Sequence, residues 1–443
     1  MRMFRLILVG FGSLVAAMIC QGCGDAVERD WTNVILISID TLRADHLGVY
    51  GYHRDTSPAI DSFARDAVVF RDAIAQAPRT LPSHAAIFTS LLPSHNGALG
   101  NYGYKLSDDE LTMAEILAGQ GFTTVAFTDG GLMSATYGLA QGFEHFHSAQ
   151  ERGRFETRVA PALEWISEHQ DEPFFLFLHT YEVHLPLEPA PEYLNLFETE
   201  YSGPLPDAIP GDLCWRINQG EVEISDEDLG HLIALYDGAI RSMDDSFQDL
   251  IHFLKASDLY DSSLIVFTSD HGEEYGERGR VAHHGSTLFD EALRVPLIIK
   301  LPKRLADGSR VIDTQVRSLD ILPTIMDVVG IAALDHFEGT SLMGSALGGQ
   351  QEPLPAVSQI VGGRQVSLRD GSWKLIRKRS GTRLYDLRID PSESANVKRR
   401  HKRAVRRLDS RLDRMLGARP AKETPFEPTD EEIEELRALG YVD

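Results

Sequence analysis

The chain has 443 residues, 43% of them hydrophobic, which is enough for one large α/β domain with an appendage and a sizeable core. Its 66 Asp and Glu residues outnumber 43 Lys and Arg, and the net charge of −23 argues against a nucleic-acid backbone as partner. Two of its three cysteines, Cys20 and Cys23, lie near the N-terminus, so Cys214 has no intramolecular disulfide partner in the body of the protein and is expected to be a bystander.

The first 23 residues have the features of an export signal. A basic start is followed by an apolar run over 6–19, which is shorter than the roughly 20 residues that a membrane span needs. The run ends in Cys20-Gln-Gly-Cys-Gly24, where Gly22 before Cys23 resembles a bacterial lipobox, although Cys20 stands where a branched aliphatic residue is usual. We expect an exported protein, periplasmic or at the cell surface, anchored to a membrane by a lipid on Cys23. Plain secretion and an uncleaved anchor are the alternatives.

Five apolar, β-branched runs alternate with helical patterns within residues 31–348, which we interpret as the catalytic domain. Such runs are typical of strands buried on both faces of a sheet, and their alternation with helices predicts an α/β fold with a mostly parallel central sheet flanked by helices. The expected strands are Asn33–Asp40, Thr123–Thr128, Phe174–Leu178, Leu264–Ser269 and Pro296–Ile299.

Two helices of this domain have recognisable start signals. Ser107–Glu110 has the spacing of a capping box, which predicts a helix that carries Met113 and Leu117. A longer helix is expected to begin near Ser225, because apolar residues follow at helical spacing as far as Leu254. Its apolar face is expected to be core.

Two segments depart from this pattern. Residues 188–223 are rich in Pro, Gly and acidic side chains without a clear period, which indicates a loop or insertion on the active-site side. Within residues 349–443, short alternating strands at Arg364–Leu368 and Trp373–Arg377 predict a small antiparallel C-terminal subdomain with a helical tail. The basic run at 398–407 is interpreted as the solvated face of a helix.

The candidate nucleophile is Thr80, in the stretch Ala77–His95. Proline suits the first helical position, so Pro82 is expected to begin a helix that leaves Thr80 just outside its positive end. Unpaired N–H groups and the helix dipole favour an anion there, such as an esterified phosphate or sulfate. An ordinary turn entering a helix is the alternative interpretation.

Polar side chains follow two of the expected strands. Asp40 and Thr41 end the first strand, and Asp270 and His271 end the fourth. Since ligands of open α/β sheets gather at the carboxyl ends of strands, these four residues and the Thr80 hydroxyl would form one shell for a divalent cation. The shell is mostly oxygen, which favours calcium, with manganese or zinc as alternatives. The metal would lower the pKa of the hydroxyl and shield the charge of the substrate.

Three histidines would complete the site. His84 lies one helical turn beyond Thr80, His184 follows the third strand, and His284 lies in Ala282-His-His-Gly285. His184 and His284 are candidate ligands for substrate oxygens, and all three are candidates for catalytic proton transfer. Each of them alone would more often be a surface or capped histidine.

Taken in order, these motifs resemble those of the sulfatase family, within the alkaline phosphatase superfamily, over nearly the whole mature chain. The matching stretches are Asn33–Gly48 with Tyr50-Gly51, Thr80–His84, Gln141–Phe143, Ser269–Gly272, Leu288–Pro296, Trp373–Leu375 and Leu384–Leu387. The resemblance implies the sulfatase fold and metal ligands at Asp40, Asp270 and His271. It also implies that Thr80 is the nucleophile position and that His184 contacts the substrate oxyanion.

Several positions depart from the family's pattern. Thr80 stands where sulfatases carry the Cys or Ser that is oxidised to formylglycine, and its methyl-bearing β-carbon would give a ketone instead. His84 replaces the signature arginine, His284 stands where a lysine is common, and the family's Lys-Trp-His stretch is absent near Asp129–Leu132. Threonine is, however, the unmodified nucleophile of sister families that cleave phosphodiesters or transfer phosphoethanolamine and phosphoglycerol groups.

We therefore expect a metal-dependent hydrolase that cleaves a sulfate or phosphate ester of a small molecule, glycan or lipid head group outside the cytoplasm. Family resemblance favours sulfate, whereas direct attack by Thr80 favours a phosphodiesterase, phosphonate hydrolase or phosphotransferase. The competing class is a catalytically silent protein of the same fold that binds a glycan or another anion.

Overall fold

The structure is a computed structural model that describes residues 31–149, 152–198, 200–306, 308–360 and 364–438. The expected export signal at 1–23 and the lipidation site Cys23 lie outside these residues. Within the described part of the chain, no helix is both long and apolar enough to cross a membrane.

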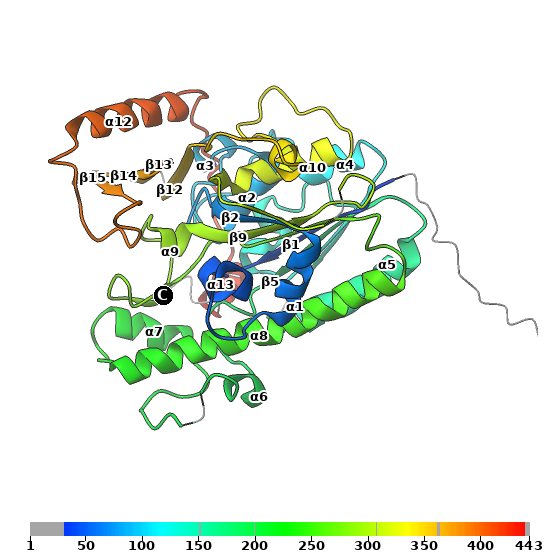
Figure 1. The fold of residues 1–443 in the computed structure, drawn as a ribbon. Coiled ribbons are helices and arrows are strands. Elements are labelled where there is room, and N and C mark those ends of the chain that lie inside the picture. Colours follow the sequence, from blue (N-terminus) through cyan, green and yellow to red (C-terminus); the bar gives the residue numbers. More distant parts are fainter. Residues whose placement is uncertain (1–30, 150–151, 199, 307, 361–363, 439–443) are drawn as a thin grey trace, which may run out of the picture.

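A nine-stranded sheet forms the centre of the described structure (Figure 1), in the order β10-β2-β9-β6-β1-β5-β3-β4 with β11 paired to β2. Only β9 runs antiparallel to its neighbours in this sheet, so the predicted mostly parallel fold is confirmed. The strands are β1 (Val34–Ile39), β2 (Val68–Ile74), β3 (Thr123–Thr128), β4 (His145–Ser148), β5 (Phe174–Thr180), β6 (Leu264–Thr268), β9 (Arg294–Lys300), β10 (Arg310–Ile312) and β11 (Val316–Arg317).

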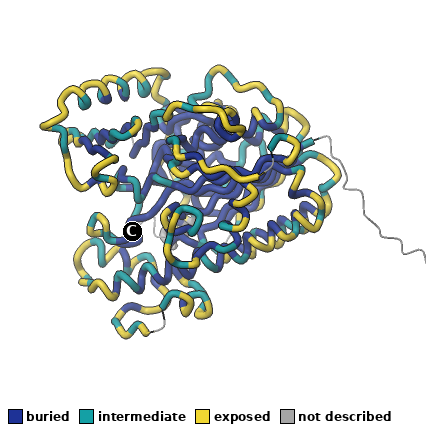
Figure 2. Tube along the Cα trace, viewed as in Figure 1, coloured by how far each residue is buried: buried dark blue, intermediate teal, exposed yellow. Residues whose placement is uncertain are grey.

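The middle strands are buried on both faces, as their composition predicts, because helices cover the two sides of the sheet (Figures 1 and 2). Val34 and Leu36 of β1 point into one core, whereas Ile35 and Ile37 point into the other. The first core includes residues of α2 (Thr80–Thr89), α4 (Met113–Ala118) and α10 (Ile321–Val328), and the second includes residues of α1 (Pro58–Phe63), α5 (Glu156–His169) and α8 (Asp226–Ala256).

Two of the three helix starts differ from expectation. The long helix α8 begins as predicted, because the Ser225 hydroxyl accepts the N–H of Asp228 in a capping box. The capping box of α4 is instead formed by Thr112 and Glu115, while Ser107 belongs to a preceding turn.

Helix α2 starts two residues before the predicted Pro82, so Thr80 is its first residue rather than a residue outside it. Proline is accommodated as the third residue because the first N–H groups of a helix have no intrahelical acceptor. The N–H of Leu81 donates to Asn101 Oδ1 and that of Ser83 to the Arg79 carbonyl. An anion at the start of α2 would therefore interact mainly with the helix dipole, and not with the predicted row of unpaired N–H groups.

The described residues of 188–223 include two short helices, α6 (Pro191–Leu194) and α7 (Gly211–Asn218). The hairpin of β7 (Glu274–Tyr275) and β8 (Val281–His283) lies beside α7. The Asn218 amide both donates to and accepts from the backbone of Val281, each at 2.9 Å. These two bonds hold α7 against the loop that carries His283 and His284.

The predicted C-terminal subdomain is an antiparallel sheet of β12 (Ala356–Ile360), β13 (Gln365–Asp370), β14 (Trp373–Lys378) and β15 (Gly381–Asp386). One face packs on α12 (Lys402–Leu416) through Leu408 and Leu412. The part of the basic run at 402–407 lies on this largely exposed helix, as predicted (Figure 2), whereas residues 398–401 precede it. The other face packs on the main domain, where Lys374 is buried between Asp290 and Glu393.

The remaining helices are α3 (Pro93–Asn96), α9 (Asp290–Leu293), α11 (Met343–Ala346), α13 (Asp430–Ala438) and the 3-10 turns at Ala44–His46, Gly48–Tyr50, Ala64–Asp66, Gly131–Met133, Ala135–Tyr137 and Ser318–Asp320.

Candidate active site

Asp40, Asp270 and His271 meet at the carboxyl ends of the neighbouring parallel strands β1 and β6. One ligand atom from each lies within 4.8 Å of the others, and all three side chains are fully buried. His271 Nε2 is 3.3 Å from Asp270 Oδ2 and 4.0 Å from Asp40 Oδ1. The predicted metal-ligand triad is therefore brought together in space.

The backbone orients these side chains. Asp270 Oδ1 accepts the N–H groups of Thr41 and His271, at 3.3 and 2.8 Å, which leaves Oδ2 directed at the triad. His271 Nδ1 lies 3.0 Å from the Gly272 carbonyl, which leaves Nε2 as the ligand atom. These backbone contacts fix Asp270 and His271 in orientations that suit the binding of a cation.

A divalent cation fits this donor set. Both oxygens of Asp40, Oδ2 of Asp270 and Nε2 of His271 are buried atoms without a hydrogen-bond partner among the described residues. Burial raises the pKa of Asp40 to about 6, although the neighbouring His271 lowers it. Burial also raises the pKa of Asp270, and the Asp40 carboxyl raises it further. Two buried carboxylates at such close range need a counter-charge, which a bound cation would supply.

Thr41 joins the site mainly through its backbone. Its hydroxyl donates to the Asp40 carbonyl at 2.7 Å, while its N–H supports Asp270. A hydroxyl that donates a hydrogen bond still has a lone pair with which it can bind a metal. Metal ligation by Thr41 therefore stays a prediction.

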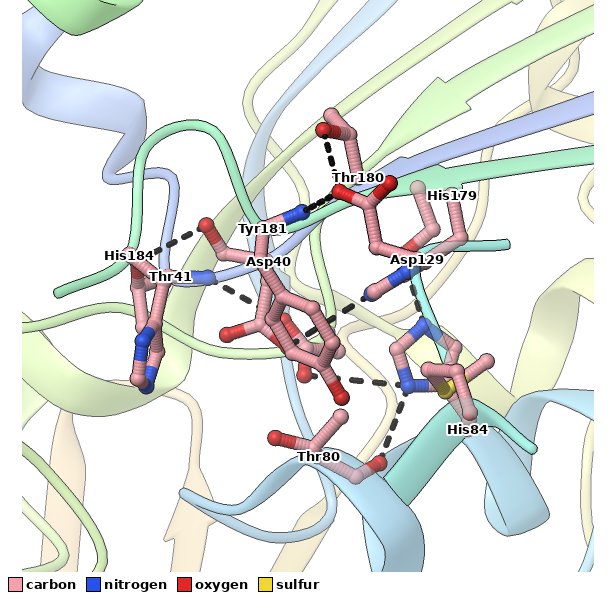
Figure 3. Close-up of polar contacts among 12 residues, drawn as sticks. Asp40, Thr41, Thr80, His84, Asp129, His179, Thr180, Tyr181 and His184 are labelled. Carbon is pink, nitrogen blue, oxygen red and sulfur yellow. Dashed lines mark hydrogen bonds and ion pairs between the residues drawn. The ribbon is translucent and has the colours of Figure 1, made fainter. Parts of the chain in front are cut away.

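Thr80 is buried at the start of α2, and Figure 3 shows its side chain directed toward the region between Asp40 and Tyr181. It lies near enough to the Asp40 carboxyl to lower its pKa, against the larger effect of burial. The Ser83 hydroxyl donates to the Asp270 carbonyl at 2.6 Å, which ties the first turn of α2 to the end of β6. This link places the candidate nucleophile beside the triad.

His84 lies beneath the triad rather than on an open surface. Its Nδ1 is 2.9 Å from the Thr80 carbonyl and 3.7 Å from Asp270 Oδ2, and its Nε2 is 2.9 Å from Ser38 Oγ. Burial lowers the pKa of His84 to about 4, although Asp270 opposes this effect, so the ring is neutral at pH 7. The contact with the Thr80 carbonyl ties His84 to the first turn of α2. The predicted role of His84 in proton transfer stays a prediction.

His184 and His284 lie together on the other side of the triad. The His284 ring centroid is 5.1 Å from that of His184 and 4.5 Å from that of His271, and His284 Nδ1 is 2.8 Å from Glu273 Oε1. Burial lowers the pKa of His184 to about 3 and that of His284 well below its usual range. An incoming anion would favour their protonated forms, which suits the predicted contact with substrate oxygens.

Comparison with known families identifies the fold. A family model described as Sulfatase matches residues 32–331, and one described as N-sulphoglucosamine sulphohydrolase, C-terminal, matches residues 281–418. The chain belongs to the sulfatase family. It is 26% identical over 435 residues to a sulfatase of Formosa agariphila, with 83% of each chain covered. This membership makes it an ester hydrolase with the fold of the alkaline phosphatase superfamily, as its motifs predict.

Solved structures show the same fold. A phosphonate monoester hydrolase of Agrobacterium radiobacter superposes with a TM-score of 0.72 at 21% identity, covering 90% of this chain and 100% of that one. A protein in complex with its substrate D-glucosamine-2-N,6-O-disulfate superposes with a TM-score of 0.73 at 18% identity, covering 88% and 99%.

The sequence interpretation missed two residues of this sulfatase-family site. His179 at the end of β5 has its Nε2 3.6 Å from Asp40 Oδ2. It pairs with Ser38 of β1, so the strand-end argument that found Asp40 could have found it as well. Arg152 donates to the carbonyls of Tyr181 and His184 and lowers the pKa of Asp40, although burial outweighs this effect. Arg152 comes from a loop, and no motif marks it.

A pocket of about 290 Å³ opens beside His184 and His284. Its other walls are formed by Arg79, by Arg280 with Ala282 and His283, and by α7 with the following Gln219, so this part of the segment 188–223 lies on the active-site side. None of the described residues that line it is acidic, which suits an anionic substrate. Cys214 also lines it, but burial raises the pKa of this thiol to about 12, which agrees with a bystander role.

Proposed function

We propose that this sulfatase-family hydrolase depends on a divalent metal and cleaves a phosphodiester or phosphonate ester through direct attack by Thr80. The position of Thr80 beside the buried triad, at the first residue of α2, is the observation that carries this proposal. A threonine side chain cannot become formylglycine, so the chemistry of the residue favours its own hydroxyl as nucleophile.

The roles of the residues follow from their positions. Asp40, Asp270 and His271 would hold the cation, with Thr80 as a further oxygen ligand, and calcium is favoured over manganese or zinc by the oxygen-rich set. Such a cation, when bound, lowers the pKa of a hydroxyl and shields negative charge. Thr80 Oγ, its proton released to solvent, would attack phosphorus as the bond to the leaving oxygen breaks, and water would later cleave the ester on Thr80. His184 and His284, protonated once the anion is bound, would bind the non-bridging oxygens and donate a proton to the leaving oxygen.

A sulfate ester of a glycan is the second candidate substrate. It is supported by the family itself and by the fold neighbour whose own substrate is a glucosamine disulfate. The exposed Trp215 beside the pocket offers an apolar face against which a sugar ring could pack.

A substrate panel distinguishes these esters. We expect the wild-type protein to prefer phosphodiester or phosphonate substrates over sulfate esters by at least about tenfold in kcat/KM, which corresponds to about 1.4 kcal/mol. Mass spectrometry of the peptide that carries Thr80 should show an unmodified residue. A preference for sulfate esters with Thr80 unmodified would contradict the proposal, and anion binding without turnover of any ester would favour the catalytically silent alternative.

Export with lipidation of Cys23 is part of the same proposal and is supported by the leader sequence at 1–23. One acyl chain binds a membrane only marginally, whereas the several chains of a bacterial lipoprotein hold a protein stably. We expect both globomycin and Cys23→Ala to leave a larger, unprocessed form on an immunoblot of fractionated cells. A cytosolic protein that retains residues 1–23 in untreated cells would contradict this part of the proposal.

A further inference from the structure

His179 lies beside the metal-ligand triad without being one of its members. It is the last but one residue of β5, and the parallel register places it opposite Ser38 of β1. Its side chain is fully buried, and its Nε2 lies 3.6 Å from Asp40 Oδ2 (Figure 3). On the other side of β1, the loop after β6 brings His271 Nε2 to 4.0 Å from Asp40 Oδ1. The Asp40 carboxyl therefore has a histidine on each side.

The two ring nitrogens of His179 are buried atoms without a hydrogen-bond partner among the described residues. Burial lowers the pKa of His179 to about 3, although Asp270 opposes this effect, so the ring is neutral at pH 7. A neutral imidazole has one N–H donor and one acceptor nitrogen, and a buried donor without an acceptor destabilises the folded protein. Asp40 Oδ2 lies close enough to become its acceptor. A proton on Nε2 would therefore satisfy both groups.

Aromatic neighbours restrict the orientation of the His179 ring. The rings of His84 and Tyr181 meet it edge to face, with centroids 5.2 and 4.7 Å away. Phe177, two residues earlier on β5, stacks against it with a centroid distance of 6.4 Å. Because the ring is packed on these sides, its Nε2 is held in the direction of Asp40.

The other triad members already have the support that a metal ligand needs. Asp270 Oδ1 accepts two backbone N–H groups, and His271 Nδ1 lies 3.0 Å from the Gly272 carbonyl. Metal-binding carboxylates are ordinarily hydrogen-bonded as well, and loss of such a partner lowers metal affinity about 10–100-fold. Among the described residues, no backbone N–H donates to the Asp40 carboxylate. A neighbouring side chain has to supply this support, and His179 is placed to do so.

We propose that His179 is a positioning residue of the metal site, whose Nε2–H donates a hydrogen bond to Asp40 Oδ2 when the cation is bound. The bond would fix the orientation of the carboxylate and leave Oδ1, on the side of His271, for the metal. A role as a further ligand fits less well, because among the described residues only Asp40, Asp270 and His271 bring ligand atoms within 4.8 Å of one another. This inference rests on the proposed function, since it assumes the divalent cation.

The first experiment titrates the metal-free full chain with Mn²⁺ by calorimetry and compares two amides in place of His179. We expect His179→Asn to bind Mn²⁺ at least about tenfold more weakly, because its shorter side chain cannot bring an N–H to Asp40. His179→Gln places an amide N–H near the position of Nε2 and should stay within about threefold of the wild type. The exposed His252→Asn is the matched control and should bind as the wild type does. Equal affinity in His179→Asn and the wild type would overturn the proposal.

The second experiment separates loss of metal binding from loss of the fold. The melting temperature of the metal-free protein should be similar in the wild type and in His179→Asn, whereas Mn²⁺ should raise it less in the variant. His179→Leu, an apolar variant of similar volume, should show the same smaller rise, so the result does not depend on the folding of one variant. Equal rises in all three proteins would contradict the proposal.

Two further outcomes identify which idea has failed. Pulsed electron paramagnetic resonance of the Mn²⁺-loaded protein should show one directly bound imidazole nitrogen, from His271, in the wild type and in His179→Asn. A second bound nitrogen that disappears in His179→Asn would make His179 a ligand and overturn its positioning role. A wild type that binds neither Mn²⁺ nor Ca²⁺ would refute the proposed metal dependence and this inference with it. Metal binding that does not depend on His179 would refute the inference alone.

Discussion

Thr80→Ala is expected to lower kcat/KM for any true substrate by about 10⁴-fold or more, because it removes the proposed nucleophile. The variant should fold normally and keep its bound metal, since one small side chain at the first position of α2 is lost while Ser83 still ties that turn to Asp270. Thr80→Ser keeps the hydroxyl and should remain partly active. Steady-state kinetics, circular dichroism and elemental analysis measure these three properties.

Experiments on Thr80 also distinguish hydrolysis of phosphate esters from hydrolysis of sulfate esters. Turnover of a phosphate ester should leave a transient ester on Thr80, which acid quenching and mass spectrometry can detect. Thr80→Cys, expressed with a formylglycine-generating enzyme, should gain aryl sulfate hydrolysis if the rest of the site is competent for that reaction. Unaltered turnover in Thr80→Ala would remove Thr80 from the mechanism.

Asp270→Asn is expected to remove the bound divalent cation and to lower turnover by about 10³-fold, because a neutral amide cannot replace the charge of a metal-binding carboxylate. The side chain should keep its place, since the amide oxygen can still accept the N–H groups of Thr41 and His271. The metal content of the purified protein is measured by plasma mass spectrometry.

Asp313→Asn is the matched control, because this carboxyl is exposed and lies outside the site. It should retain both metal and activity. Full metal content in Asp270→Asn, or full activity of the wild type after thorough chelation, would contradict the metal-dependent mechanism.

Local patterns predicted most of the fold. The strands β1, β3 and β6 are buried almost along their whole length, and only a position between two helical layers removes both faces of a strand from water. The helix starts were less predictable. Ser107–Glu110 and Thr112–Glu115 offer similar capping spacings, and Thr112 forms the cap because Met113 and Leu117 then face the core.

The chain alone determined the chemistry that is available, namely Asp40 and Asp270–His271 at strand ends and Thr80 in a stretch that resembles the family's formylglycine motif. These residues could be grouped because parallel strands end at one edge of a sheet. Only the tertiary structure decided the surroundings. Arg152 reaches the site from a loop, and Gln365 of the C-terminal sheet donates to the Ser286 carbonyl beside the loop that carries His284. Such contacts join segments that are distant in sequence. Their packing depends on the whole chain, so no local periodicity in the sequence predicts it.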